Sequence, residues 1–396
     1  MSQMKQFDPR VSLLDTVDEQ IEIDLLPLVP QVDQQSFYPV DYLRVLGTVG
    51  GFSATVPNEF GGLAQDLSLQ IEVTQRVARA CGTTAFLVWC QSSCAWYFQH
   101  TPNAAIRERY LTQVASGKVL AATGMSNAIK HLAGIEKIHL SAQRSGDGYL
   151  VRGNLPWVSN VGPDHLIAVA AAVEGEGYLM FALRGDTEDL SLHPCPAFSG
   201  MEGSSTLNLR FRDVYVGAND VLAHPAQFAS YIARIKPGFV LGQVGMGMGV
   251  AQGALQTIRE SNVTHAHVNA FLDGQEGELT AHLTSLQSRV KVLAQQASAG
   301  DTPLLPVLKL RAEASELALQ AATSAVLHAG ARGYLMRHSA QRRLREAAFV
   351  SIVTPALKHL RFEIASLERA QLGQIQQQQF TATVPQQVAP NHQAVA

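Results

Sequence analysis

Apolar residues recur at helical spacing through the N-terminal part of the chain. The segment IEVTQRVARACGTTAFLVWCQSSCAWYFQ, residues 71–99, places apolar side chains three or four positions apart over several turns. Pro57, Gly61 and Pro102 separate this segment from its neighbours. The pattern predicts a helical domain over residues 1–118.

The spacing changes to strict alternation after this domain. The segment HLSAQRSGDGYLVRG, residues 139–153, consists of two alternating runs around SGDG, which is typical of a hairpin. The runs HLIAVAAAV, YLMFALRG and TLNLRFRDVYV follow, each rich in the residue types that strands favour. The sequence therefore predicts a compact antiparallel β domain over residues 119–228.

Long helical patterns return over residues 229–370 and predict a bundle of four or five helices. One of them, LGQVGMGMGVAQG at 241–253, carries a row of glycines. No GxGxxG register fits this row and no strand precedes it, so close helix packing is favoured over a nucleotide-binding loop. Residues 371–396 are polar and rich in glutamine, and we expect a flexible tail there.

Composition narrows the classes of function. Thirty basic and thirty-three acidic residues give a formal charge of -3, which favours neither a nucleic acid nor a membrane surface as a partner. No apolar run has the length of a membrane span, and no basic start with an apolar stretch marks a signal peptide. The four cysteines show no zinc-like spacing, and the two histidines of THAHV have no further ligand at a suitable distance in the sequence. We therefore expect no metal site. We expect a cytoplasmic protein with a small-molecule ligand.

The stretch LPWVSN at 155–160 is a candidate binding element. In an extended strand, Trp157 and Ser159 point to the same face, and a ring beside a hydroxyl suits a flat ligand rich in heteroatoms. The alternative is that Trp157 packs in the core. Asp164 and His165 follow closely and are a titratable pair, although Asp164 also fits a loop aspartate that bonds to its own backbone.

Several arginines lie near the end of the predicted bundle. They could bind phosphate groups, because a guanidinium matches phosphate oxygens, or they could form a solvated helix face and salt bridges. The pattern leaves both interpretations open for these residues: Arg332, Arg337, Arg342, Arg343 and Arg345.

Three phrases, in chain order, resemble the acyl-CoA dehydrogenase superfamily. They are VPNEFGG at 56–62, DGYLVRGNLPWVSNVG at 147–162 and GMEGSSTLNLRFRDVYVGANDVLA at 200–223. The resemblance implies an α+β, acyl-CoA dehydrogenase-like fold: an N-terminal helical domain, a middle antiparallel β domain and a C-terminal helical bundle. It also implies an oxidoreductase that binds FAD between the β domain and the bundle, accepts a small organic substrate or an acyl-CoA, and assembles as a homodimer or homotetramer.

The same resemblance assigns residues to the cofactor. Trp157 would lie against the flavin ring and Ser159 would reach the edge where hydride arrives. The strand in LAATGMS at 120–126 would lie along the polar edge of the flavin. The predicted cofactor-binding residues are Leu120, Ala122, Thr123, Trp157 and Ser159.

The chain departs from the family pattern at its catalytic base. Thr354, in the stretch 344–356, occupies the position of the usual glutamate, and a second usual position, within 232–242, contains no carboxylate. A threonine hydroxyl cannot serve as that base. The base is therefore unidentified, with His165 and Asp164 as candidates.

The departures at the FAD contacts leave two further alternatives open. The family's Arg-x-x-Phe-Gly motif falls on HAHVN at 265–269, and Leu327 replaces a glutamine. A flavin-dependent monooxygenase on the same fold would need no such base. A non-catalytic relative with weak flavin binding would need neither the base nor the FAD contacts.

Overall fold

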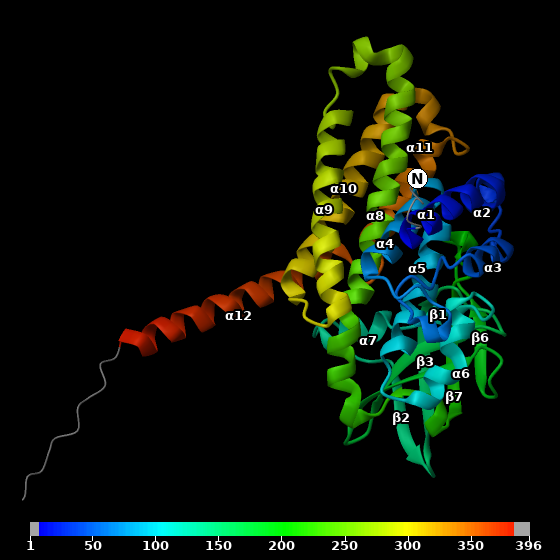
Figure 1. The fold of residues 1–396 in the computed structure, drawn as a ribbon, viewed down its shortest axis with the longest axis vertical. Helices are drawn as coiled ribbons and strands as arrows, with labels where there is room; N and C mark the ends of the chain where they lie inside the picture. The colour runs from blue at the N-terminus through cyan, green and yellow to red at the C-terminus, as the bar shows by residue number, and fades with distance from the viewer. Residues whose placement is uncertain (1–7, 384–396) are drawn as a thin grey trace, which may run out of the picture.

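The computed structural model describes residues 8–383, which form a helical region, a β-sheet region and a helical bundle in chain order (Figure 1). The order agrees with the predicted fold class. The N-terminal helices are α1 (Pro9–Gln20), α2 (Val29–Gln34), α3 (Val40–Thr48), α4 (Leu67–Ala80), α5 (Gly82–His100) and α6 (Ala104–Ala115).

Helix α5 is the central helix of the N-terminal region. Its sequence is apolar or small on every side, and a helix of this kind is stable when it is buried all round. The indole N–H groups of Trp89 and Trp96 donate to the carbonyls of Phe239 and Ile235, at 3.1 and 3.3 Å. Both acceptors belong to α8 (Pro225–Asn269), so α5 is fixed against the first helix of the bundle.

The eight strands form one mixed sheet in the order β6-β7-β3-β2-β4-β5-β8, with β1 beside β4. The prediction of a purely antiparallel domain was wrong at two pairings, because β1 and β2 both run parallel to β4. Helix α7 (Ser126–Leu132) connects β1 to β2. The strands are β1 (Ala121–Thr123), β2 (Leu140–Ser145), β3 (Gly148–Val158), β4 (Leu166–Val173), β5 (Gly177–Arg184), β6 (Leu190–Pro194), β7 (Leu207–Val216) and β8 (Val221–Ala223).

The predicted hairpin is present as β2 and β3. The two strands pair antiparallel from Leu140 with Gly153 to Ser145 with Gly148. Gly146 begins the turn with φ of 60°, a conformation that glycine adopts without steric cost.

The bundle contains five helices among the residues described, α8 to α12. The glycine row lies on α8, where a Cβ at Gly245, Gly247 or Gly249 would come within 2.7 Å of a backbone carbonyl oxygen of α4 or α10. Close helix packing is therefore confirmed as the role of these glycines. The remaining bundle helices are α9 (Glu276–Ala299), α10 (Leu304–Ala329), α11 (Ser339–Ile352) and α12 (Leu357–Thr383).

We expect Gly249→Ala to destabilise the protein by about 1–3 kcal/mol, because the new methyl group would overlap the Gln75 carbonyl at 2.3 Å. Gly277→Ala is the matched control. A Cβ there meets nothing within 4 Å, so alanine should stabilise α9 by up to about 1 kcal/mol. Urea unfolding of both variants measures the difference, and equal stabilities would contradict the packing role.

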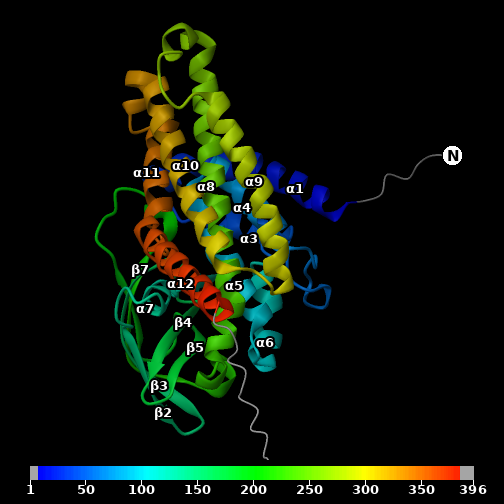
Figure 2. The ribbon, with the colours of Figure 1, turned by 90° about the vertical axis from the view of Figure 1, so that its left-hand side faces the viewer.

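Helix α12 extends away from the rest of the molecule in Figure 1, and in Figure 2 the same helix lies in front of the molecule, on the side that faces the viewer. It continues to Thr383, whereas the sequence analysis placed the start of a flexible tail at residue 371. The glutamine-rich stretch 371–383 continues the helix, because glutamine has good helix propensity, and the flexibility of this segment stays a prediction. The part of the predicted tail at 384–396 lies outside the described residues.

Candidate active site

A cavity of about 820 Å³ lies between the β-sheet region and the helices. One wall carries Trp157 and several hydroxyl groups from β1, α7 and the segments around β3 and β7. A second part of the lining carries four aromatic rings from α5, α8 and α11. The polar wall is formed by Thr123, Ser126, Trp157, Ser159, Ser204 and Thr206, and the aromatic wall by Phe86, Trp89, Phe239 and Phe349.

The aromatic wall is closely packed. The ring centroids of Phe86 and Phe349 are 4.7 Å apart in an edge-to-face arrangement, and those of Trp89 and Phe239 are 4.9 Å apart. Contacts of this kind hold rings rigidly and exclude water from the surface between them. This side of the cavity therefore suits an apolar ligand group.

Hydroxyl groups on the polar wall are fixed by one another. Ser159 and Ser204 both hydrogen-bond to the hydroxyl of Thr206, at 2.6 and 2.7 Å. The Thr123 hydroxyl lies 3.0 Å from that of Tyr97, a buried residue of α5. The wall thus offers ordered donors and acceptors to a ligand with polar edges.

Trp157 and Ser159 line the same cavity, but not for the predicted reason. The pairing of β3 with β7 shifts register between Leu155 and Val158, and Trp157 has φ of 57°. The alternation of an extended strand therefore fails at this point, and the assumption of regular geometry was wrong. The bulge leaves Trp157 62% exposed, which also rules out the alternative that its ring packs in the core.

The other predicted cofactor residues divide into two groups. Thr123 lines the cavity. Leu120 and Ala122 are buried and lie outside its walls, where the Leu120 carbonyl accepts from Leu166 N–H and Ala122 pairs with Ile167. The Leu120 side chain packs in the core that the helices form, and the Ala122 side chain packs in the core of the sheet.

The structure does not bring the candidate bases His165 and Asp164 to the cavity. His165 is buried and its Nδ1–H donates to the Asn160 carbonyl at 2.8 Å. Burial lowers the pKa of His165 and outweighs the opposite effects of Asn160 and Asp164. The Asp164 side chain is 62% exposed and lies 3.9 Å from Arg44. Neither residue belongs to the cavity walls.

Thr354 does lie in the cavity wall. Its hydroxyl accepts a hydrogen bond from Ser126 at 2.6 Å, and its carbonyl accepts one from Gln243 of α8 at 2.8 Å. Thr354 is buried, and its hydroxyl is held beside Ser126 of the polar wall.

Sequence reasoning missed four titratable residues of the cavity, Lys130, Glu136, Lys358 and His359, and the pKa is shifted for Glu136 and His359. Burial raises the pKa of Glu136. Hydrogen bonds from Lys130 and Asn127 lower it by more, so the net shift of the pKa is downward. Burial lowers the pKa of His359, and the charges of Lys358 and Lys130 lower it further. No motif in the sequence marks any of the four, because the fold alone brings them to the cavity.

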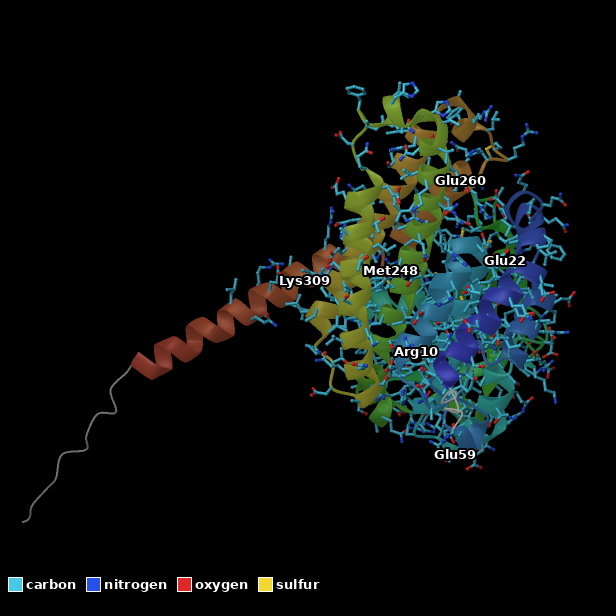
Figure 3. The ribbon with its side chains drawn as sticks, turned by 45° about the horizontal axis from the view of Figure 1, so that its top comes forward. Arg10, Glu22, Glu59, Met248, Glu260 and Lys309 are labelled. Carbon is cyan, nitrogen blue, oxygen red and sulfur yellow. The ribbon has the colours of Figure 1, made fainter. Side chains whose placement is uncertain are left out.

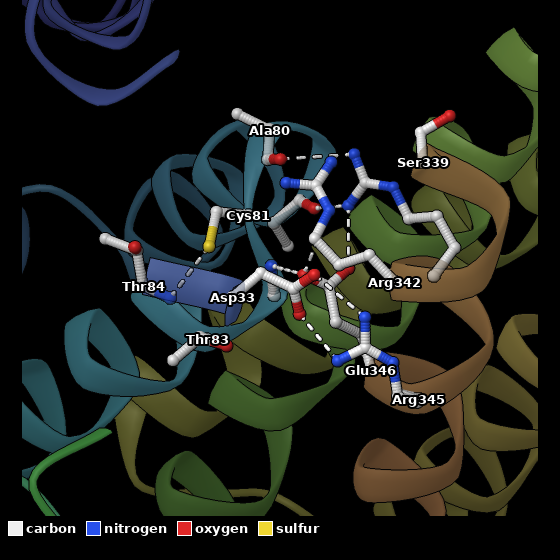
Figure 4. A network of polar contacts seen from close by, with 12 residues as sticks. Asp33, Ala80, Cys81, Thr83, Thr84, Ser339, Arg342, Arg345 and Glu346 are labelled. Atoms are coloured by element: carbon white, nitrogen blue, oxygen red, sulfur yellow. Dashed lines mark hydrogen bonds and ion pairs between the residues drawn. The ribbon is translucent and has the colours of Figure 1, made fainter. Parts of the chain in front are cut away.

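The arginines near α11 are mostly engaged within the chain (Figure 4). Glu346 accepts from the Gly82 backbone N–H at 2.7 Å and from Arg343 at 2.9 Å. Arg345 forms a bidentate pair with Asp33, at 2.7 and 2.8 Å. These contacts tie α11 to α5 and α2, so Arg343 and Arg345 have a structural role. The same contacts set the position of the wall that α11 contributes to the cavity.

Two features of the described residues limit other functions. No group of three or more His, Cys, Asp or Glu side chains within 8–383 could hold a metal ion. No helix in this range is both long and apolar enough to cross a membrane.

The comparisons with known proteins all find similarity to acyl-CoA dehydrogenases. Residues 10–118 match the family model described as acyl-CoA dehydrogenase, N-terminal domain. The chain is 21% identical over 349 residues to the short-chain specific acyl-CoA dehydrogenase of Clostridium acetobutylicum, covering 85% of this chain and 91% of that protein.

Solved structures share the fold. Butyryl-CoA dehydrogenase from Megasphaera elsdenii is similar with a TM-score of 0.82 and 19% identity, covering 92% of this chain and 99% of that chain. A glutaryl-CoA dehydrogenase from Mycobacterium smegmatis, in complex with FADH2, is similar with a TM-score of 0.78 and 15% identity, covering 91% and 95%.

Proposed function

We propose, from the chain's membership of the acyl-CoA dehydrogenase superfamily, that it is an FAD-dependent oxidoreductase of the acyl-CoA dehydrogenase type. Its substrate is a small organic molecule or an acyl thioester. The observation that carries the proposal is the cavity of about 820 Å³, with Trp157 and fixed hydroxyls on one wall and four aromatic rings on the other.

The cavity walls fit a flavin ring system. Trp157 presents an exposed ring at the rim, and the hydroxyls of Thr123 and Ser159 supply hydrogen bonds to a polar edge. A flat, heteroatom-rich ring needs both kinds of contact. When bound, FAD supplies the acceptor for a hydride from the substrate.

The aromatic wall and the Ser126–Thr354 hydroxyl pair bind and shield the substrate. The rings of Phe86 and Phe349 exclude water from its apolar part, and the Thr354 and Ser126 hydroxyls can hydrogen-bond to its oxygen atoms. Glu136 is the carboxylate among the wall residues, and Lys130 and Asn127 hold it in its ionised form.

Thr354 favours a second candidate function. A monooxygenase on this fold needs no carboxylate at that position, and the hydroxyl pair Ser126–Thr354 leaves the position neutral. Oxygen consumption in the presence of a reduced nicotinamide or flavin donor, with product retaining an added oxygen atom, would favour this candidate over dehydrogenation.

Titration of the purified protein with FAD, followed by visible absorption and fluorescence, tests both candidates. We expect saturation at one FAD per chain. A protein that purifies without flavin and binds none when FAD is added would contradict both and would favour a non-catalytic relative. The proposed location is the cytoplasm, which suits the four unpaired cysteines.

We also propose a homodimer or homotetramer. Large apolar side chains are exposed at the end of the bundle where α8 and α10 finish: Val263 (83%), Phe271 (89%), Tyr334 (80%) and Met336 (61%). The Ser324 hydroxyl donates to the Gly274 carbonyl at 2.8 Å, which places the two helix ends side by side. Exposed apolar side chains grouped in this way are typical of an interface.

We expect Phe271→Asp to reduce the molar mass measured by light scattering at micromolar concentration, because a charge at the centre of an apolar interface is left unpaired. Tyr215→Asp is the control, since Tyr215 is exposed on β7, away from the bundle. A monomer mass for the unmodified, flavin-bound protein would contradict self-association.

A further inference from the structure

Arg311 is a buried cation at the centre of the bundle. Its side chain is fully buried on α10, and its Nε donates to Gln243 Oε1 at 2.8 Å. One Nη donates to the Val350 carbonyl at 2.6 Å, and the other bonds to the Ser315 hydroxyl. All three partners are neutral.

Arg343 shows how this chain otherwise buries an arginine. It is also buried, and the carboxylate of Glu346 lies 2.9 Å from it. Arg311 forms no ion pair with any residue in 8–383. Burial lowers the pKa of Arg311 to about 9, so its guanidinium remains charged at neutral pH. Burial of a charged side chain without a carboxylate partner costs free energy of folding, so we expect Arg311 to have a role beyond packing.

Arg311 is connected to the cavity wall at two points. Val350, whose carbonyl it binds, directly precedes the wall segment 351–354. At the other end, Gln243 accepts from Arg311 and donates to the Thr354 carbonyl at 2.8 Å. Arg311 thus fixes both ends of the segment that presents Thr354 to the cavity.

The other charges near this wall segment are compensated. Lys130 lies 2.7 Å from Glu136, and Arg345 lies 2.7 Å from Asp33. Thr354 and its partner Ser126 are neutral. Arg311 therefore leaves this end of the cavity with a net positive charge, to which Lys358 at the rim adds.

We propose that Arg311 is a positioning residue that holds Thr354 through Gln243 and makes this end of the cavity electropositive, so that the site prefers an acyl substrate carrying a carboxylate over a neutral one. The preference for a thioester rests on the proposed function. The electropositive wall does not, because it follows from Arg311, Gln243 and Thr354 alone.

The first experiment compares two probes by calorimetry on the FAD-loaded protein: glutaryl-CoA, which carries a carboxylate, and butyryl-CoA, which does not. We expect tighter binding of glutaryl-CoA, and we expect Arg311→Met to reduce the ratio of the two affinities by about tenfold. A purely structural role would weaken both probes equally. Arg311→Lys should retain part of the preference, because it keeps the charge.

Lys309→Met is the matched control. Lys309 lies on the same helix and is labelled in Figure 3, but it is half-exposed and paired with Glu368. This variant removes the same charge and should leave the affinity ratio unchanged. Equal affinities for the two probes in the unmodified protein, or an unchanged ratio in Arg311→Met, would overturn the proposal.

The second experiment needs neither substrate nor flavin. Thr354→Cys places a thiol at the wall, and its pKa is read from the pH dependence of alkylation in a Cys195→Ser background. Cys81, Cys90 and Cys94 are buried with raised pKa values and stay unreactive. We expect Arg311→Met to raise the pKa of the introduced thiol by about one unit. An unchanged pKa would refute the electropositive wall, whereas a shifted pKa with no binding of either thioester would refute the acyl-CoA substrate instead.

Discussion

The unmodified protein is expected to leave its bound flavin oxidised when it is mixed anaerobically with straight-chain acyl-CoAs, and Thr354→Glu is expected to permit bleaching of the flavin. Removal of the α proton needs a positioned base, and the hydroxyl of Thr354 cannot accept a proton at any accessible pH. A carboxylate at this position should raise the rate of flavin reduction by about a hundredfold or more. The positive charge of Arg311, two hydrogen bonds away, should lower the pKa of that carboxyl and keep it ionised at neutral pH.

Thr354→Gln is the matched control for this experiment. Glutamine has the same size as the glutamate of Thr354→Glu but cannot act as a base, so the flavin should remain oxidised. Rapid bleaching in the unmodified protein would contradict the expectation and would point to Glu136, the carboxylate in the cavity wall. Glu136→Gln would then abolish the reaction.

Trp157→Ala is expected to weaken FAD binding by about tenfold or more. An exposed aromatic ring at the rim of a cavity can stack on a flavin, and loss of a stacked ring costs about 0.5–1.5 kcal/mol beyond the loss of buried area. Equilibrium titration with FAD measures the change, and Trp157→Phe should restore most of the affinity because it keeps a flat ring.

Tyr215→Ala controls for the loss of a surface aromatic ring. Tyr215 is 48% exposed on β7 and lies outside the cavity. Its removal should leave FAD affinity unchanged. Equal affinities of the unmodified protein and Trp157→Ala would show that the ring does not contact the flavin.

The sequence was sufficient for the order and type of the elements. Helical periodicity, strand alternation and the glycine of the hairpin turn depend on interactions between near neighbours in the chain. Residues 10–118 match the family model that the resemblance named, and the predicted fold is confirmed by its likeness to the solved structures. The mixed sheet was missed because the parallel pairings of β1 and β2 with β4 join strands that are distant in the chain.

The candidate site was predictable where a motif marks it and not elsewhere. Trp157, Ser159 and Thr354 were found from phrases of the sequence and all line the cavity. Asp164 and His165 were chosen for nearness in sequence, and the turn after β3 carries them away from the cavity. Arg311, Glu136 and His359 stand in segments without a motif. The position of Arg311 and His359 depends on helix packing, and that of Glu136 on the loop between α7 and β2.

The walls of the cavity also constrain the order of events during synthesis. Phe86 and Trp89 leave the ribosome early, whereas Phe349, Thr354 and His359 come from the last eighth of the chain. A nascent chain that ends before α11 has three of the four aromatic rings and the hydroxyl groups of the polar wall, but it lacks Phe349, Thr354 and His359. We therefore expect any ligand of this cavity to bind only after α11 and the segment that follows it have been synthesised. Until then the ring of Phe86 lacks its partner Phe349 and leaves apolar surface exposed.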